Sequence, residues 1–322
     1  MRTVRIHETG GPEVMRIEDL PVPQPEDGQA VVRLDAAGIN FIDIYHRLGQ
    51  YRLSLPFTLG QEGAGVVERV GPGVTEVRAG DRVAYSNVGG SYAEYVVAPS
   101  WRLVPVPAGL SSAQAAAAML QGMTAHYLSH TTYPVTPGTS ALVHAAGGGV
   151  GQLLVQMIKR RGGRVIGTVS SEAKAAVARE AGADDLIKYT ETDFVTEVRR
   201  LTGGRGVDVV YDSVGRDTFA QSLECLVLRG MIVLFGQASG PVPPFDPQVL
   251  NAKGGLFLTR PSLHQYTHTR EELLSRARDV LGWIADGTLR LRIDRTYPLD
   301  AAPEAHQYLA SRKAMGKLLL LP

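Results

Sequence analysis

The chain has 322 residues, with 33 basic and 32 acidic side chains and 44% hydrophobic residues, a profile expected of two domains with separate cores. Because the net charge is only +1, nothing in the charge balance favours binding to nucleic acid or to an anionic membrane. The N-terminus lacks an apolar signal segment, and no window approaches about 18 uninterrupted apolar residues. These features predict a cytoplasmic protein that does not span a membrane. A single cysteine, Cys225, excludes internal disulfides and multi-cysteine metal sites.

The first 122 residues contain short β-branched runs separated by Gly and Pro, at 30–34, 65–70 and 81–85. This pattern predicts a small, mostly antiparallel β domain. A helical stretch over 111–128 follows, with Ser111 and Ser112 as its expected cap. We expect this helix to be the crossing point between two domains.

The segment 141–151 is an apolar strand that enters a glycine-dense turn and then a helix at 152–158. Gly147 and Gly148 permit a tight turn and let backbone N–H groups approach a diphosphate, and Gly151 allows close helix–strand packing. The positive end of the helix then faces the anion. A second strand, 164–169, completes this variant of the dinucleotide-binding fingerprint, which is a specific signal only in such a strand–turn–helix context.

The residues after the second strand favour NADP over NAD. An NAD site usually has an acidic residue there that accepts from the ribose 2′-hydroxyl, whereas this chain has Ser170 and Ser171, followed by Glu172 and Lys174. Hydroxyls and an ammonium suit a 2′-phosphate. In the alternative interpretation Glu172 is the ribose ligand and Lys174 a solvated helix residue, although an acid in a first helical turn is also expected from capping.

Strands and helices continue to alternate up to residue 265, with strands expected at 206–211, 230–235 and 255–259. This alternation predicts an α/β fold with a doubly wound parallel sheet. Helical spacing over 219–228 predicts that Cys225 is a buried packing residue.

The tail holds expected helices at 269–286 and 302–312 and an apolar strand at 317–321. A strand of that composition needs a sheet, and we expect it to return to the first domain. The predicted domains are therefore 1–122 with 266–322, and 123–265.

Four motifs, at 38–43, 60–65, 79–83 and 144–151, resemble those of the medium-chain dehydrogenase/reductase superfamily. Within it, the chain is similar to the zinc-independent, zeta-crystallin-like NADPH:quinone oxidoreductases, and 211–215, 259–262 and 311–312 also match that branch. The resemblance covers nearly the whole chain. It implies a Rossmann cofactor domain and a GroES-like catalytic domain.

Two zinc-ligand positions of the superfamily carry amides in this chain. Zinc-dependent members need a Cys near the position of Asn40 and a His at that of Gln61, because Zn²⁺ selects thiolate and imidazole ligands. The eight His residues show no paired ligand spacing. No metal site is therefore expected.

On the substrate side, the resemblance implies roles for Asn40, Tyr45 and Tyr51, whose amide and phenol groups can donate hydrogen bonds to an oxygen that gains negative charge. The alternative for the tyrosines is half-buried packing, and Asp43 is equally well explained as a helix cap or an ion-pair residue. The cofactor-binding residues expected from the fingerprint and the resemblance are Thr124, Gly147, Gly148, Gly149, Val150, Gly151, Ser170, Lys174, Tyr189, Phe235, Gln237 and Arg312. Arg312 is equally well explained as a helix-end residue that compensates the helix dipole.

The resemblance implies reduction of small quinones by NADPH, without a metal. Quinones are strong acceptors, so the protein has chiefly to align the reactants and exclude water. Two alternatives stay open: NADPH-dependent reduction of the C=C bond of enals and enones, and NADPH binding without turnover. The resemblance and the expected sheet edge at 255–259 also predict a homodimer through the cofactor domains.

Overall fold

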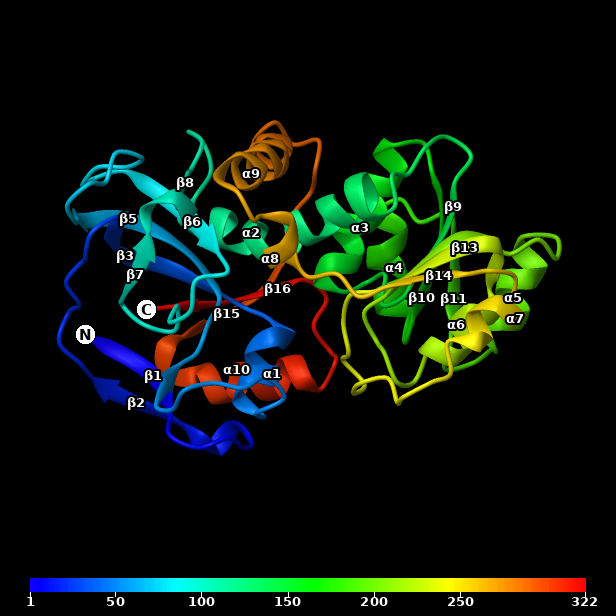
Figure 1. Cartoon of the computed structure of the whole chain (residues 1–322), viewed down its shortest axis with the longest axis horizontal. Coiled ribbons are helices and arrows are strands. Elements are labelled where there is room, and N and C mark those ends of the chain that lie inside the picture. The colour runs from blue at the N-terminus through cyan, green and yellow to red at the C-terminus, as the bar shows by residue number, and fades with distance from the viewer. The chain divides into compact units, whose positions relative to one another are not determined.

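In the computed structural model, which describes residues 1–322, the chain divides into two units. The first unit contains Met1–Met123 and Thr267–Pro322, and the second contains Thr124–Tyr266. These limits lie one residue from the boundaries expected from the sequence. Each unit carries its own strands and helices, labelled in Figure 1.

Short strands make up most of the first unit. One sheet has the order β2-β1-β4, and a second has the order β15-β16-β3-β5-β6-β8, with β7 also paired to β3. All of these pairs are antiparallel except β15 with β16. The strands are β1 (Arg2–Ile6), β2 (Met15–Asp19), β3 (Gln29–Ile39), β4 (Phe57–Thr58), β5 (Glu62–Val70), β6 (Arg82–Ser86), β7 (Tyr95–Pro99), β8 (Val104–Pro105), β15 (Ile293–Pro298) and β16 (Lys317–Leu321).

Strand β3, with 11 residues, organises the larger sheet. Strand β5 pairs along one side of it, and β7 and β16 share the other side, β7 along 29–33 and β16 along 37–39. In Figure 1 the red strand β16 accordingly lies among the blue and cyan strands. The expectation that the C-terminal strand returns to the first domain is confirmed.

The helices of the first unit are α1 (Phe41–Arg47), α9 (Arg270–Ala285) and α10 (Ala302–Ala310), with short 3-10 turns η1 (Pro12–Val14), η2 (Ser100–Arg102) and η4 (Leu299–Ala301). Helix α2 (Ser112–Tyr127) runs from the first unit into the second. Helix α9 begins after Thr269, whose hydroxyl accepts from the Glu272 N–H at 3.2 Å and so caps the helix.

Helix α1 is held against the sheet by apolar packing. Its Ile44 shares a buried cluster with Leu309 of α10, Ile39 of β3 and Leu318 of β16. Burying an aliphatic side chain of this size contributes about 1.5 to 3 kcal/mol. The residues at the start of α1 are therefore fixed relative to both β3 and the C-terminal strand.

The second unit has a six-stranded sheet in the order β11-β10-β9-β12-β13-β14, with every pair parallel. This confirms the predicted doubly wound sheet. The strands are β9 (Ser140–Val143), β10 (Arg164–Val169), β11 (Asp185–Lys188), β12 (Val207–Asp212), β13 (Leu226–Leu234) and β14 (Phe257–Thr259). The helices are α3 (Gly149–Arg160), α4 (Glu172–Glu180), α5 (Phe194–Leu201), α6 (Phe219–Glu224), α7 (Gln248–Ala252) and α8 (Leu263–Tyr266), with a π-helical turn η3 (Leu128–Thr132).

Helices cover both faces of this sheet. Leu142 lies in register with Ile166 and Val210, so the three side chains share one face, and they pack in one cluster with Phe194 of α5 and Leu223 of α6. Helix α3 contacts β9 and β10 without contributing to that cluster. Figure 1 shows α3 and α4 apart from α5 and α6 across the strands.

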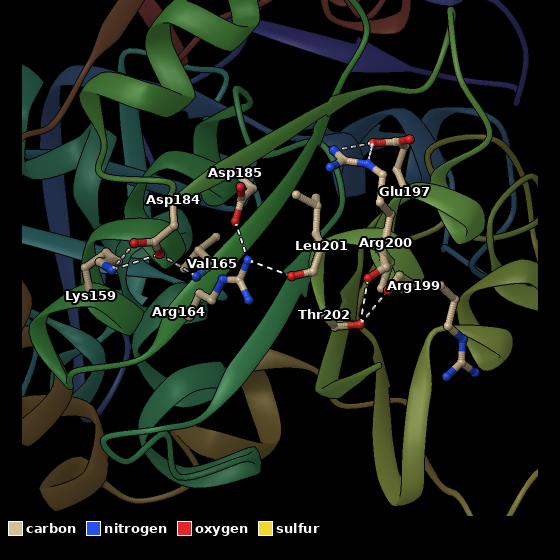
Figure 2. A network of polar contacts seen from close by, with 11 residues as sticks. Lys159, Arg164, Val165, Asp184, Asp185, Glu197, Arg199, Arg200, Leu201 and Thr202 are labelled. Carbon is tan, nitrogen blue, oxygen red and sulfur yellow. Dashed lines mark hydrogen bonds and ion pairs between the residues drawn. The ribbon is translucent and has the colours of Figure 1, made fainter. Parts of the chain in front are cut away.

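Strand β11 was not among the elements expected from the sequence. Figure 2 shows the polar contacts that hold its start. Arg164 of β10 donates to Asp185 at 2.8 Å and to the carbonyl of Leu201 at 3.0 Å. Asp184 accepts from Lys159 at 2.7 Å and from the backbone N–H of Val165 at 2.7 Å. These bonds join the amino ends of β10 and β11 to α3 and α5. They therefore help to determine which residues lie at the carboxyl ends of the two strands.

The helix expected over 219–228 is shorter than its spacing suggests. Helix α6 ends at Glu224, and Leu226 already begins β13. The prediction of helix beyond Cys225 was therefore wrong, because a parallel strand pairing overrides local spacing. Cys225 itself is buried, as expected, and burial raises the pKa of its thiol to about 12.

No helix in the fold is both long and apolar enough to cross a bilayer.

Candidate active site

The glycine loop of the second unit lies between β9 and α3. A Cβ atom at Gly147 would lie 2.7 Å from the carbonyl oxygen of Lys174, and one at Gly151 would lie 2.3 Å from that of Ala145. Ala145 has a φ of 53°, so the loop turns through the left-handed region. Gly148, Gly149 and Val150 are half-buried at the start of the 12-residue helix α3. The loop thus brings several backbone N–H groups to one helix N-terminus, which fits a diphosphate.

The residues expected around a 2′-phosphate come together at one corner of the same sheet. Ser170 directly follows β10 and Tyr189 directly follows β11, and the Tyr189 N–H donates to the carbonyl of Val169 at 3.2 Å. Lys174 lies one turn into α4, where its N–H donates to the capping Ser171 hydroxyl at 3.4 Å. Tyr189 is 46% exposed, and Ser170 and Lys174 are half-buried.

Glu172, the alternative ribose ligand, interacts with cations of its own unit. Its carboxylate lies 3.6 Å from Arg179 and 3.7 Å from Lys188. These ion pairs, together with the favourable interaction of a carboxylate with the start of helix α4, explain why residue 172 is acidic. They favour the interpretation in which Lys174 and Ser170, and not Glu172, face the ribose substituent.

Two further loops follow β12 and β13. Asp212, at the end of β12, accepts from the backbone N–H groups of Val214 at 2.8 Å and Gly215 at 3.0 Å. Phe235 directly follows β13 and donates its N–H to the carbonyl of Asp212 at 2.8 Å. Gln237 lies in the same loop, packed against Gly215. Phe235 and Gln237 therefore lie at the carboxyl edge of the parallel sheet, where open α/β sheets bind their ligands.

Thr124 is the first residue of the second unit and is buried within α2. His144, directly after β9, has both ring nitrogens occupied, at 2.9 Å from the Thr168 hydroxyl and 2.9 Å from the Ser222 hydroxyl. This histidine is a satisfied core residue.

In the first unit, Asn40 lies between the end of β3 and the start of α1 and is 4% exposed. Its side-chain Nδ2 donates to Glu62 Oε1 at 2.6 Å, and its Oδ1 accepts from the Lys317 ammonium at 2.8 Å. Lys317 also forms an ion pair with the same Glu62 oxygen, and both charged side chains are fully buried. We call Asn40, Glu62 and Lys317 the buried triad.

Tyr45 and Tyr51 belong to an aromatic cluster beside α1. Their ring centroids lie 6.2 Å apart, and the His46 ring meets the rings of Tyr51 and Phe57 at 5.8 Å each, edge to face. Tyr45 is 8% exposed and Tyr51 is 39% exposed. Tyr45 is therefore a packing residue of the aromatic cluster, in line with the alternative interpretation, whereas more of the Tyr51 side chain is exposed.

Asp43 caps α1 from within the helix. Its Oδ2 accepts from the Asn40 backbone N–H at 2.8 Å and from the Tyr92 hydroxyl at 3.1 Å, and its Oδ1 is buried without a hydrogen-bond partner. Burial raises the pKa of this carboxyl from 3.8 to about 7, against the lowering effects of the Asn40 N–H and the Lys317 charge.

A chain of hydrogen bonds leads from Arg47, the first donor, to Asp43, the last acceptor. Burial lowers the pKa of His306 to about 3, with a smaller effect from Arg47, so its imidazole is neutral. Since Tyr92 donates to Asp43, it must accept from His306 Nε2 at 2.9 Å, and His306 Nδ1 then accepts from Arg47 at 3.3 Å. The geometry thus defines the tautomer.

Arg312 lies in the first unit, in the exposed loop between α10 and β16, with a φ of 58°. The proposed site residues thus divide into a substrate set in the first unit and a cofactor set in the second, with Arg312 in the first.

Glu62 and Lys317 were not predicted as site residues. A signal was present: each is a charged residue within an apolar or small-residue strand, and charges at such positions are usually paired. No three His, Cys, Asp or Glu side chains gather in an arrangement that could hold a metal ion.

Two family models match the chain. Residues 26–108 match the alcohol dehydrogenase GroES-like domain, and residues 181–320 match the family described as zinc-binding dehydrogenase. With the two units described above, these matches define a protein of the medium-chain dehydrogenase/reductase class.

Similar proteins narrow that class. The chain is 43% identical over 323 residues to quinone oxidoreductase 1 of Escherichia coli, covering 99% of each. It is 42% identical over 325 residues to a 2-haloacrylate reductase of a Burkholderia species, covering 98% of each. The crystal structure of Escherichia coli quinone oxidoreductase complexed with NADPH is similar with a TM-score of 0.98 and 43% identity, over 100% of both chains. The chain therefore belongs to the quinone oxidoreductase family, which confirms the resemblance seen in its motifs.

Proposed function

We propose that this protein reduces small quinones with NADPH and without a metal ion. The observation that carries the proposal is the chemistry of the substrate set, in which an amide, Asn40, lies at the start of α1 and a phenol, Tyr51, packs against Tyr45 of the same helix. Asn40 and Gln61 supply neither thiolate nor imidazole where zinc-dependent members need them. Neutral donors suffice for an electron-poor acceptor, and the relationship to quinone oxidoreductases supports the same substrate class.

In the proposed reaction, NADPH supplies the hydride when it is bound. The N–H groups at the start of α3 hold the diphosphate, and Ser170, Lys174 and Tyr189 bind the adenosine end with its 2′-phosphate. We assign Thr124, Phe235, Gln237 and Arg312 to the nicotinamide end. Asn40 and Tyr51 donate hydrogen bonds to the quinone oxygen as it gains charge, and Tyr45 packs behind Tyr51.

The test is steady-state oxidation of NADPH in the presence of a naphthoquinone, with and without a chelator. The proposal requires quinone-dependent oxidation that the chelator does not reduce. If quinone does not accelerate NADPH oxidation, the protein is better described as a cofactor-binding protein without turnover, which is the second interpretation left open by the sequence. If the chelator abolishes turnover, the metal-independent mechanism is wrong.

A second candidate function is reduction of an activated C=C bond. The observation in its favour is the 42% identity to a 2-haloacrylate reductase, nearly as high as that to a quinone oxidoreductase. Such a reaction would use the same cofactor set and the same neutral donors. Substrate comparison is therefore needed to separate the two candidates.

Lys174→Ala should weaken NADPH binding and leave NADH binding nearly unchanged. A charge-assisted hydrogen bond to the 2′-phosphate contributes about 1.5 to 3 kcal/mol, or roughly ten- to hundredfold in affinity. Fluorescence titration of both cofactors measures the two losses. Arg179→Ala, on the same helix and paired with Glu172, is the matched control, and equal losses for both cofactors in Lys174→Ala would make the residue structural.

We also propose a cytoplasmic location, which cell fractionation tests. We further propose that the protein forms a homodimer through its cofactor domains. Strand β14 lies at the edge of the parallel sheet, so one side of its backbone lacks a strand partner. Phe257 of β14 is 56% exposed, and Leu228 of the neighbouring β13 is 76% exposed. A free edge strand with apolar neighbours favours pairing with its two-fold copy.

Phe257→Lys should shift this dimer towards the monomer, because two copies of the charge would meet across the two-fold axis. Sedimentation velocity at micromolar concentration measures the shift. Ile17→Lys, on the exposed edge strand β2 of the first unit, is the control and should sediment like the unaltered protein. A monomeric unaltered protein would overturn the proposal.

A further inference from the structure

Lys317 is a fully buried lysine on the C-terminal strand, and its ammonium contacts only the other two members of the buried triad. Strand β16 brings it beside the end of β3, since Leu318 pairs with Ile39. Removing an ammonium and a carboxylate from water costs several kcal/mol for each ion, so a buried pair is not by itself a stabilising device. The placement of this pair against a proposed active-site residue therefore calls for a functional explanation.

The hydrogen bonds of the triad form a closed ring. Glu62 Oε1 accepts from both Lys317 Nζ and Asn40 Nδ2, while Lys317 Nζ also donates to Asn40 Oδ1. The ring therefore uses the Nδ2 hydrogen on the same side of the amide as Oδ1. The second Nδ2 hydrogen, on the side of Cβ, is not used by the ring.

The charges allow only one orientation of the amide. If the Asn40 amide turned by 180° about the Cβ–Cγ bond, Oδ1 would face the Glu62 carboxylate and the NH₂ group would face the Lys317 ammonium. Both contacts would be repulsive, because a carboxylate only accepts and an ammonium only donates hydrogen bonds. Lys317 thus discriminates between two amide orientations of nearly equal shape.

The surrounding structure is built to hold the carboxylate in place. A Cβ atom at Gly38 would lie 2.2 Å from Glu62 Oε1, so only glycine leaves room for it. The other oxygen, Oε2, accepts from the backbone N–H of Leu120 in α2 at 2.6 Å. Both oxygens of Glu62 are therefore fixed by backbone and side-chain partners.

We propose that Lys317 is a positioning residue for the active site: through Glu62 and Oδ1 it locks the Asn40 amide so that its second N–H is presented to the substrate oxygen. This inference rests on the proposed function, because it assigns Asn40 its role in the same reaction. A purely structural ion pair would instead stabilise the fold without affecting how much Asn40 contributes to turnover.

The first test observes the amide directly and does not require activity. In a ¹⁵N-resolved NMR spectrum of the full chain, Asn40→Ala identifies the side-chain NH₂ signals. We expect the hydrogen bonded to the carboxylate to lie well downfield of its ordinary position in the unaltered protein, and to return towards that position in Lys317→Met/Glu62→Gln. Ordinary shifts in the unaltered protein, or a downfield shift that is unchanged in Lys317→Met/Glu62→Gln, would overturn the inference.

The second test measures energetic coupling. Lys317→Met combined with Glu62→Gln removes both buried charges together and so avoids leaving one unpaired. In the unaltered background, Asn40→Ala should lower kcat/KM with a quinone by about tenfold or more. In the Lys317→Met/Glu62→Gln background, the same substitution should lower it by less than about twofold, since the amide there is no longer oriented.

The matched control is Lys253→Met with Glu224→Gln, which removes a Lys–Glu ion pair on the surface. Asn40→Ala should keep its full effect in that background. Equal effects of Asn40→Ala in all three backgrounds would overturn the inference, as would no effect in any of them. Absence of quinone turnover in the unaltered protein would instead remove the proposed function, and the NMR comparison with Lys317→Met/Glu62→Gln would still decide whether the ion pair locks the amide.

Discussion

Replacing Asp43 with Asn is expected to change how the free energy of unfolding depends on pH by about 4 kcal/mol between pH 4 and pH 8. Burial raises the pKa of this carboxyl from 3.8 to about 7, and each tenfold change in proton affinity corresponds to about 1.4 kcal/mol. Between these two pKa values the folded protein binds more protons than the unfolded chain. The contribution of Asp43 is therefore fully present below pH 4 and is lost as the pH rises through about 7.

His306 contributes with the opposite sign. Its pKa in the folded protein is lowered from 6.5 to about 3, so its contribution is present above about pH 6.5 and is lost as the pH falls towards 3. The two groups are linked through Tyr92 and offset each other in the unaltered protein. Lys317 and Glu62 are the charged groups that act on Asp43, Arg47 lies beside His306, and all three are kept in the variant.

Urea unfolding of the unaltered protein and Asp43→Asn at pH 5 and pH 8 isolates the Asp43 contribution, because the contribution of His306 cancels in the difference. The variant should gain stability relative to the unaltered protein on going from pH 5 to pH 8. Asp27→Asn, at an exposed position, should show no such gain. If both variants follow the pH profile of the unaltered protein, Asp43 is ionised in the fold at neutral pH and this account of its burial is wrong.

The second large effect is expected for Lys317→Met alone. This substitution keeps the length of the side chain but leaves the Glu62 carboxylate buried without its counter-charge. Breaking one partner of a buried pair typically costs about 3 to 5 kcal/mol. The double variant Lys317→Met/Glu62→Gln should recover most of that loss, since it leaves no buried charge unpaired and the amide oxygen can still accept from the Leu120 N–H.

Urea unfolding at pH 7 measures both variants, with Lys253→Met, from a partly exposed ion pair, as the control, for which a change below about 1 kcal/mol is expected. A loss in Lys317→Met no greater than that of the control would mean that Glu62 is solvated or takes up a proton at little cost. The buried triad would then lack the electrostatic strength that the positioning role of Lys317 requires.

Much of the fold can be predicted from local sequence. Local sequence patterns predict the glycine loop, the strand at 164–169 and the apolar strand at 317–321. These patterns can be recognised without knowing which other segments the three pack against. Strand β11 could not be predicted, because its four residues mix charged and apolar side chains and its start is held by Arg164 and Asp185 through tertiary contacts (Figure 2). The end of α6 was missed for a similar reason, since pairing with β12 draws the residues after Cys225 into β13.

In the candidate site, too, some residues can be predicted from the sequence and others depend on tertiary contacts. Ser170, Lys174 and Tyr189 follow from the order of strands, because the carboxyl ends of neighbouring parallel strands meet at one edge. The buried triad does not follow from order alone. Lys317 and Glu62 are 255 positions apart in the sequence, and their contact depends on the register of β16 and β5 against β3. A charged residue in each of β5 and β16 indicated a buried partner of opposite charge, but did not show which residue that partner is.

The most direct test of the proposed function compares kcat/KM for NADPH oxidation with small ortho- and para-quinones, 2-alkenals, 2-haloacrylate, simple ketones and ethanol as the reaction partner. We predict clear turnover of the quinones and negligible turnover of ketones and ethanol, because a carbonyl that is not electron-poor needs a stronger acid than the donors of Asn40 and Tyr51. Robust reduction of 2-alkenals or 2-haloacrylate with negligible quinone turnover would contradict the assignment and move this protein to C=C bond reduction.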